Sequence, residues 1–118
     1  MYKRQALLIS KKASKNGFEW ENIDQIWDKL HEELEELKDA LKKENSSKAE
    51  AEIGDVLFTL INIARWNKIS IEEGLAKTNK RFLERLAYIE ENLDGELHSQ
   101  SKKKLEKYWE LAKVDLKH

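Results

Sequence analysis

Apolar residues recur along this 118-residue chain at spacings of three and four, the period of an amphipathic α-helix. The alternating pattern that is typical of strands is nearly absent. The chain contains no Pro, and its four Gly are widely spread, as suits long helices joined by short connections. The pattern therefore predicts an all-α fold, a compact bundle of about five helices in a single domain over residues 1–118.

The first predicted helix covers about residues 3–15 and ends at Asn16-Gly17, because Gly favours the turn that follows a helix. A second helix is predicted over about residues 23–43, where one stripe of apolar residues repeats at helical spacing. The stripe consists of Ile23, Ile26, Trp27, Leu30, Leu34, Leu37 and Leu41. The segment Asn45-Ser46-Ser47 ends this helix and offers a cap for the next one.

The third predicted helix, over about residues 48–67, is apolar around most of its circumference. We therefore expect it to be the central, buried helix of the bundle. At about 100° per residue, its polar residues collect into one narrow strip. The strip consists of Lys48, Glu52, Asp55, Thr59 and Asn62. Polar groups on a buried helix need partners or a ligand, so this strip is a candidate site.

Two further helices complete the predicted fold. Ser70-Ile71-Glu72-Glu73 matches a capping box and opens a fourth helix, which runs to about residue 93 before Asp94-Gly95. A last helix is predicted near the C-terminus, where apolar and aromatic residues share one face. They are Leu105, Tyr108, Trp109, Ala112 and Leu116.

Composition narrows the classes of function. Hydrophobic residues make up 40% of the chain and charged residues 38%, and the net charge of −1 gives no general attraction for nucleic acid or for an anionic membrane. No apolar run approaches the ~20 residues of a membrane span, and the N-terminal segment lacks the apolar core of a signal peptide. The absence of Cys excludes disulfides and thiolate metal sites. We expect a cytoplasmic protein with neither a nucleic-acid nor a membrane partner.

Two acidic segments, HEELEE and EIGD, point to a metal site. Glu33 and Glu36 share one face of the second predicted helix, and Glu52 and Asp55 share one face of the third. If these faces meet, four carboxylates converge, and their mutual repulsion calls for a cation. Oxygen ligands without Cys or His favour Mg²⁺ or Mn²⁺, and Mg²⁺ commonly serves a phosphate substrate.

Alternatives to metal binding are open for both acidic pairs. Glu33 and Glu36 could belong to a solvated acidic face, as many glutamates of charged helices do. Glu52 and Asp55 lie among apolar neighbours, so a structural role for them requires a salt bridge, for example to Lys48. Without such a partner, burial of an ionised carboxylate would lower the stability of the fold by roughly several kcal/mol, because the charge loses its contact with water.

A triphosphate needs cations beyond one Mg²⁺, and the chain offers several. The candidates are Lys29, Lys48, Arg81, Arg85 and Lys113. Each could equally be ordinary surface charge, and Trp109, one turn before Lys113, could be a core residue instead of a platform for a base. No Gly-rich phosphate loop is present.

The order and spacing of the acidic segments resemble those of a known family. Glu32-Glu33-Leu34-Glu35-Glu36, followed by Glu52-Ile53-Gly54-Asp55, matches the EExxE and ExxD pattern of the all-α nucleoside triphosphate pyrophosphohydrolases. The continuations GDVLFTLINIAR, KTNKRFLERL with YIEE, and YWELAK resemble the catalytic C-terminal half of MazG. The resemblance runs from about Ala6, through Gly17-Phe18-Glu19-Trp20, to Lys113, which is nearly the whole chain.

The resemblance implies Mg²⁺-dependent hydrolysis of ribo- or deoxyribonucleoside triphosphates to the monophosphate and pyrophosphate, with Mn²⁺ as a substitute ion and nucleotide-pool housekeeping as the role. It implies that the ion is held by Glu33, Glu36, Glu52 and Asp55. The implied catalytic residues are Glu32, Glu33 and Lys48. Nucleotide contacts are implied for Lys29, Lys48, Arg81, Arg85, Trp109 and Lys113, although Arg81 stands where a Lys is common in the family.

A homodimer is expected as well, because the third helix is apolar over too wide an arc for so few partner helices and the family's bundles are completed by another subunit. A rival reading is a non-catalytic helical module for binding or oligomerisation, with its acidic faces merely solvated. The presence of all four implied ligand acids argues against this rival, since a scaffold needs no polar strip on its most buried helix.

Overall fold

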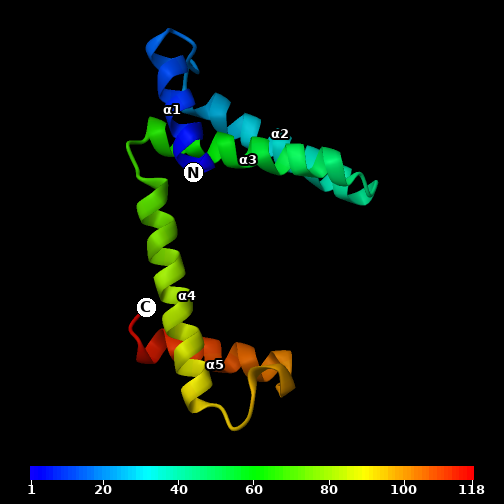
Figure 1. The fold of residues 1–118 in the computed structure, drawn as a ribbon, viewed down its shortest axis with the longest axis vertical. Coiled ribbons are helices and arrows are strands. Elements are labelled where there is room, and N and C mark those ends of the chain that lie inside the picture. Colours follow the sequence, from blue (N-terminus) through cyan, green and yellow to red (C-terminus); the bar gives the residue numbers. More distant parts are fainter. The chain divides into compact units, whose positions relative to one another are not determined.

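The computed structural model describes residues 1–118 and confirms an all-α fold with five α-helices and no strand (Figure 1). The elements are α1 (Tyr2–Lys15), α2 (Ile23–Lys42), α3 (Ser46–Trp66), α4 (Ile71–Asn92), the 3₁₀-helix η1 (Leu97–Ser99) and α5 (Lys102–Asp115). Every predicted helix is present, and the observed ends lie within a few residues of the predicted ones.

The helices belong to two compact units, residues 1–71 and residues 72–118. The first unit contains α1, α2 and α3, and the second contains nearly all of α4 together with η1 and α5. The expectation of one functional domain over residues 1–118 stays a prediction.

Local signals position the helices of the first unit. The side chain of Asn22 caps α2 by accepting a hydrogen bond from the backbone N–H of Gln25 at 3.0 Å. Asn45 caps α3 in the same way, accepting from the N–H of Lys48 at 3.1 Å. Since only residues 43–45 separate α2 from α3, the two helices run antiparallel and side by side (Figure 1).

The core of the first unit lies mainly between α2 and α3, and α1 packs against α3. Its buried apolar residues are Ile26, Leu30, Ala40, Ala49, Val56 and Ile61. The predicted apolar stripe of α2 is buried only in part, because Trp27 and the last residue of the stripe, Leu41, are exposed.

The prediction that α3 is buried around most of its circumference is wrong for this chain. Ile53, Leu57 and Leu60 are 51%, 55% and 36% exposed, whereas the polar residues Glu52 and Thr59 are buried. The reason is that only α1 and α2 of the first unit pack on α3, and they cover the side that carries the polar strip. The most apolar arc of the helix therefore remains in contact with solvent.

In the second unit, α4 and α5 are joined through η1 and touch by side-chain contacts. Tyr88 of α4 donates a hydrogen bond to Asp115 of α5, and Arg85 donates from Nε to Nδ1 of His118 at 3.0 Å. Ile89, Leu93 and Ala112 are buried. None of the helices in the chain is both long enough and apolar enough to span a membrane.

Candidate active site in the first unit

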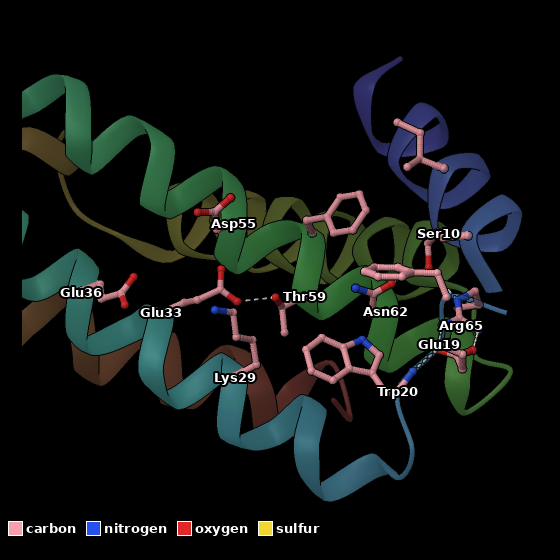
Figure 2. Close-up of a pocket in the computed structure, with 14 residues that line it drawn as sticks. Ser10, Glu19, Trp20, Lys29, Glu33, Glu36, Asp55, Thr59, Asn62 and Arg65 are labelled. Carbon is pink, nitrogen blue, oxygen red and sulfur yellow. Dashed lines mark hydrogen bonds and ion pairs between the residues drawn. The ribbon is translucent and has the colours of Figure 1, made fainter. Parts of the chain in front are cut away.

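A cavity of about 510 Å³ opens among α1, α2, α3 and the connection from α1 to α2 (Figure 2). This volume is in the range of small-molecule sites. The cavity is lined by Ile9, Ser10, Ala13, Phe18, Glu19, Trp20, Lys29, Glu33, Glu36, Asp55, Phe58, Thr59, Asn62 and Arg65. Carboxylates gather at one end of it, and aromatic and paired polar side chains form the other end (Figure 2).

The acidic end brings together side chains from two facing helices. Glu33 and Glu36 of α2 and Asp55 of α3 all line the cavity, as the helical spacing predicts (Figure 2). Glu33 is only 3% exposed, and the hydroxyl of Thr59 donates a hydrogen bond to its Oε1 at 2.5 Å. Glu33 is therefore held by α3 although it belongs to α2.

Glu52 is the least satisfied carboxylate of this group. It is buried, and its Oε2 has no hydrogen-bond partner. Burial raises the pKa of the Glu52 carboxyl above its usual 4.5, and a hydrogen bond with Glu36 and the charges of Glu36 and Asp55 raise it further, while Lys48 opposes the shift. Lys48 forms no ion pair with Glu52, so the salt bridge that a structural role would require is absent.

The chemistry of these oxygens fits a hard divalent cation, because the donors are all carboxylates and one buried oxygen has no partner. The side chains are not gathered into a finished ligand set, since no group of three or more His, Cys, Asp or Glu residues stands close enough to hold an ion. The assignment of Glu33, Glu36, Glu52 and Asp55 to Mg²⁺ therefore stays a prediction, and binding would require rotation of at least some of these side chains.

The basic and catalytic candidates of the first unit differ in position. Lys29 lines the cavity and forms an ion pair with Glu32 at 3.6 Å. Both side chains are substantially exposed, at 42% and 57%. Lys48 is exposed in the first turn of α3. The structure thus places one predicted cation in the cavity wall and leaves Glu32 outside it.

The remaining nucleotide candidates belong to the second unit. The guanidinium of Arg85 lies 5.0 Å from the centre of the Trp109 ring, and Phe82 packs on the same ring with centroids 4.9 Å apart. Arg81 is exposed, and Lys113 forms an ion pair with Glu110 at 3.2 Å. Their contact with a nucleotide stays a prediction.

The other end of the cavity contains a hydrogen-bonded network that sequence reasoning did not assign to the site. Arg65 holds Glu19 through two hydrogen bonds of 2.8 Å and donates a third, from Nε, to Ser10 Oγ at 2.6 Å. Ser10 in turn donates to Oδ1 of Asn62. The Arg65 hydrogen bonds lower the pKa of Glu19 from 4.5 to about 2.

One signal for this network was present in the sequence. Asn62 belongs to the polar strip of α3, and Arg65, three residues later, continues the strip toward the end of the helix. Ser10 and Glu19 had no comparable signal, because a single Ser in a charged helix and a single Glu in a connection are common on protein surfaces.

Comparison with known proteins agrees with the motifs. Residues 21–89 match the family described as the MazG nucleotide pyrophosphohydrolase domain. A Thermotoga maritima protein named nucleoside triphosphate pyrophosphohydrolase/pyrophosphatase MazG is 35% identical over 108 residues, which cover 89% of this chain and 41% of the relative. The Escherichia coli K12 nucleoside triphosphate pyrophosphohydrolase is 32% identical over 88 residues, or 73% of this chain and 34% of the relative.

A third relative, the uncharacterized protein YabN of Bacillus subtilis, is 46% identical over 66 residues, which are 53% of this chain and 14% of that protein. The chain thus spans less than half the length of each of these curated relatives. The family match covers more than half of the chain and includes both acidic motifs and the two helices that carry them, α2 and α3, which confirms the resemblance seen in the sequence. The chain belongs to the MazG nucleotide pyrophosphohydrolase domain family.

Proposed function

We propose that this chain hydrolyses ribo- or deoxyribonucleoside triphosphates between the α and β phosphates, giving the nucleoside monophosphate and pyrophosphate. Family membership and the names of the T. maritima and E. coli relatives support the reaction class. The observation that carries the proposal is the buried, unpartnered Oε2 of Glu52 beside the carboxylates of Glu36 and Asp55. A fold with no use for a cation at this place would gain stability by losing that charge.

In this proposal Glu33, Glu36, Glu52 and Asp55 hold Mg²⁺, and Mn²⁺ can replace it. When bound, the ion would neutralise phosphate charge and activate the attacking water. Thr59 fixes the orientation of Glu33 through its hydrogen bond. Glu33 or the exposed Glu32 would orient the water.

The lysines would act on the leaving group. Lys29 lies in the cavity wall, and the charge of Lys48 already acts on Glu52. Cations in these positions would stabilise the negative charge that develops on the departing pyrophosphate. Removal of unwanted nucleotides from the cytoplasmic pool is the role that we propose for this reaction.

A product assay tests the proposal. Purified protein should release pyrophosphate from a panel of ribo- and deoxyribonucleoside triphosphates with Mg²⁺ or Mn²⁺, and EDTA should abolish the release. Zn²⁺ should serve poorly, because the ligands are hard oxygens without imidazole or thiolate. Orthophosphate as the first product, or no metal-dependent release with any nucleotide, would refute the assignment.

We also propose that the protein is a homodimer in which a second copy covers the exposed apolar side of α3. Ile53, Leu57 and Leu60 lie on this side at helical spacing and are 36% to 55% exposed. The interface should bury more than ~1,000 Å² in total, as stable interfaces do. Analytical ultracentrifugation should give a dimer for wild type and a monomer for Leu57→Glu. A well-folded wild-type monomer at micromolar concentration would contradict the dimer.

A further inference from the structure

The hydrogen bonds at the polar end of the cavity have a fixed direction. A guanidinium can only donate, so Ser10 Oγ must accept from Nε of Arg65. The hydroxyl proton of Ser10 is then available for one acceptor, and it goes to Oδ1 of Asn62. Glu19 keeps Arg65 in place with two hydrogen bonds and with a pKa of about 2, so the carboxylate remains charged at neutral pH.

This direction sets the orientation of the Asn62 amide. If the amide were turned over, its nitrogen would face Ser10 Oγ, and the hydroxyl proton of Ser10 would lose Oδ1 of Asn62, the acceptor that it has in this structure. Ser10 is only 4% exposed, so an unsatisfied hydroxyl there is costly. The chain therefore holds Asn62 with its oxygen toward Ser10 and its nitrogen away from it.

The free nitrogen of Asn62 lies on the cavity side. In Figure 2 it is turned away from Ser10 and toward the side of Trp20 and Thr59, and it makes no hydrogen bond within the protein. Trp20 and Phe58 supply aromatic surface to the same cavity. This end of the cavity thus combines flat apolar walls with one fixed hydrogen-bond donor.

The charges indicate which part of a nucleotide fits here. Glu19 and Ser10 take three of the five N–H groups of Arg65, and the carboxylate of Glu19 neutralises the charge of the guanidinium, so this end carries no net positive charge for a phosphate. The cavity lysine, Lys29, lies nearer the acidic end, beside Glu33 (Figure 2). A flat heterocycle with hydrogen-bonding edges suits the polar end better than a phosphate does.

We propose that the polar end of the cavity is a nucleobase subsite in which the Asn62 amide nitrogen donates to a keto oxygen of the base and Ser10 is the positioning residue that fixes this donor. The inference rests on the proposed function for the identity of the ligand as a nucleotide. Because the oxygen of Asn62 is held toward Ser10, Asn62 offers no acceptor to an exocyclic amino group at the same position. The subsite therefore selects keto bases over their amino counterparts.

Matched pairs of nucleotides test this preference without hydrolysis. Inosine and adenosine monophosphates differ in a keto or amino group at one ring position and in the proton on the adjacent ring nitrogen, and so do uridine and cytidine monophosphates. Nuclear magnetic resonance titrations of the ¹⁵N-labelled, metal-free protein should show shifts of the Asn62 side-chain amide and the Trp20 indole N–H. The keto member of each pair should bind about tenfold more tightly. Equal affinities within both pairs, or shifts confined to other residues, would overturn the subsite.

Variants separate the positioning role from a purely structural one. Ser10→Ala lets the amide turn over, so the affinity ratio within each pair should fall from about tenfold toward one while binding of the amino member improves. A simple loss of structure would weaken both members alike. Asn62→Ala should also remove the preference and serves as the second variant if Ser10→Ala folds poorly. Asn67→Ala, at the exposed end of α3, is the matched control and should leave the ratio unchanged.

The two proposals fail in different ways. If pyrophosphate is released from triphosphates but both pairs bind equally, the subsite is wrong and the proposed reaction stands. If the keto preference and the Asn62 shift appear but no pyrophosphate is released under any metal, the subsite stands and the proposed reaction is wrong.

Discussion

The two ends of the cavity in the first unit differ in whether their charged side chains have partners. At the polar end, Arg65 and Glu19 form a paired network with Ser10 and Asn62, and burial of the pair is offset by hydrogen bonds. At the acidic end, Glu52 is buried with one oxygen unpartnered and its neighbours add negative charge. The polar end can hold the shape of the cavity in the absence of a ligand, whereas the acidic end is unfavourable until a cation arrives.

The largest expected effect is on activity, and it comes from removing one carboxylate charge at the acidic end. Glu33→Gln and Asp55→Asn remove one charge with little change in shape, and each should lower kcat/KM for triphosphate hydrolysis by about 100-fold or more, because a preorganised charge that holds the reacting groups is lost. Steady-state assays of pyrophosphate release measure this. Glu35→Gln, on the solvent side of α2 with a side chain 75% exposed, is the matched control and should keep wild-type activity. Equal activity of Glu33→Gln and Glu35→Gln would contradict the site.

Removing the guanidinium of Arg65 from the polar end should lower the free energy of unfolding. Arg65→Ala leaves the partly buried Glu19 carboxylate and the Ser10 hydroxyl without their partner, and we expect it to cost about 2 kcal/mol, less than for a fully buried pair. Chemical denaturation measures the change. Arg4→Ala, at an exposed position of α1, should cost little. If Arg65→Ala lowers the free energy of unfolding no more than Arg4→Ala does, the network does not stabilise the fold.

The two ends should respond to pH with opposite signs. The pKa of Glu19 is lowered to about 2, so the stability that it contributes is present above 4.5 and is lost as pH falls toward 2. The pKa of Glu52 is raised above 4.5, so its folded form binds the proton more tightly and stability is lost as pH rises through the raised pKa. Thermal melts across this range measure how the melting temperature depends on pH. Glu19→Gln should remove the fall in melting temperature toward pH 2, and Glu52→Gln should remove the fall as pH rises through the raised pKa. Unchanged slopes in both variants would refute this account.

The smallest expected effect concerns the contact that joins α3 to Glu33. Thr59→Val keeps the shape of the side chain but removes the hydroxyl that donates to Glu33, so kcat/KM should fall by about tenfold while the melting temperature changes little. Ser47→Ala, which removes an exposed hydroxyl of α3, is the control. A loss of stability without a loss of activity would show that the contact serves packing alone.

Helix positions could be predicted from sequence because each depends on local signals, such as the Asn45 cap and the glycine after α1. The meeting of Glu33, Glu36 and Asp55 at one cavity could be predicted too, since the spacing within each helix fixes the face on which a side chain lies. These features need no knowledge of which other helices are nearby.

The parts that could not be predicted depend on contacts between distant segments. The exposure of Leu57 follows from how few helices pack on α3, which periodicity does not report. The network of Ser10, Glu19 and Arg65 joins residues 46 to 55 positions apart, and each residue type is ordinary by itself. Thr59 was visible as part of the polar strip, but its hydrogen bond to Glu33 required the register between α2 and α3.

Thermal melts of wild type and Glu52→Gln, first in EDTA and then in Mg²⁺, test most directly whether the acidic end is a cation site. Glu52→Gln removes an unpartnered charge, so in EDTA it should be as stable as wild type or slightly more stable. Mg²⁺ at about 100 times its dissociation constant should stabilise wild type by roughly 2.7 kcal/mol and the variant much less. A large loss of stability of Glu52→Gln in EDTA, together with no Mg²⁺ response of wild type, would mean that the acids are structural and would contradict the account.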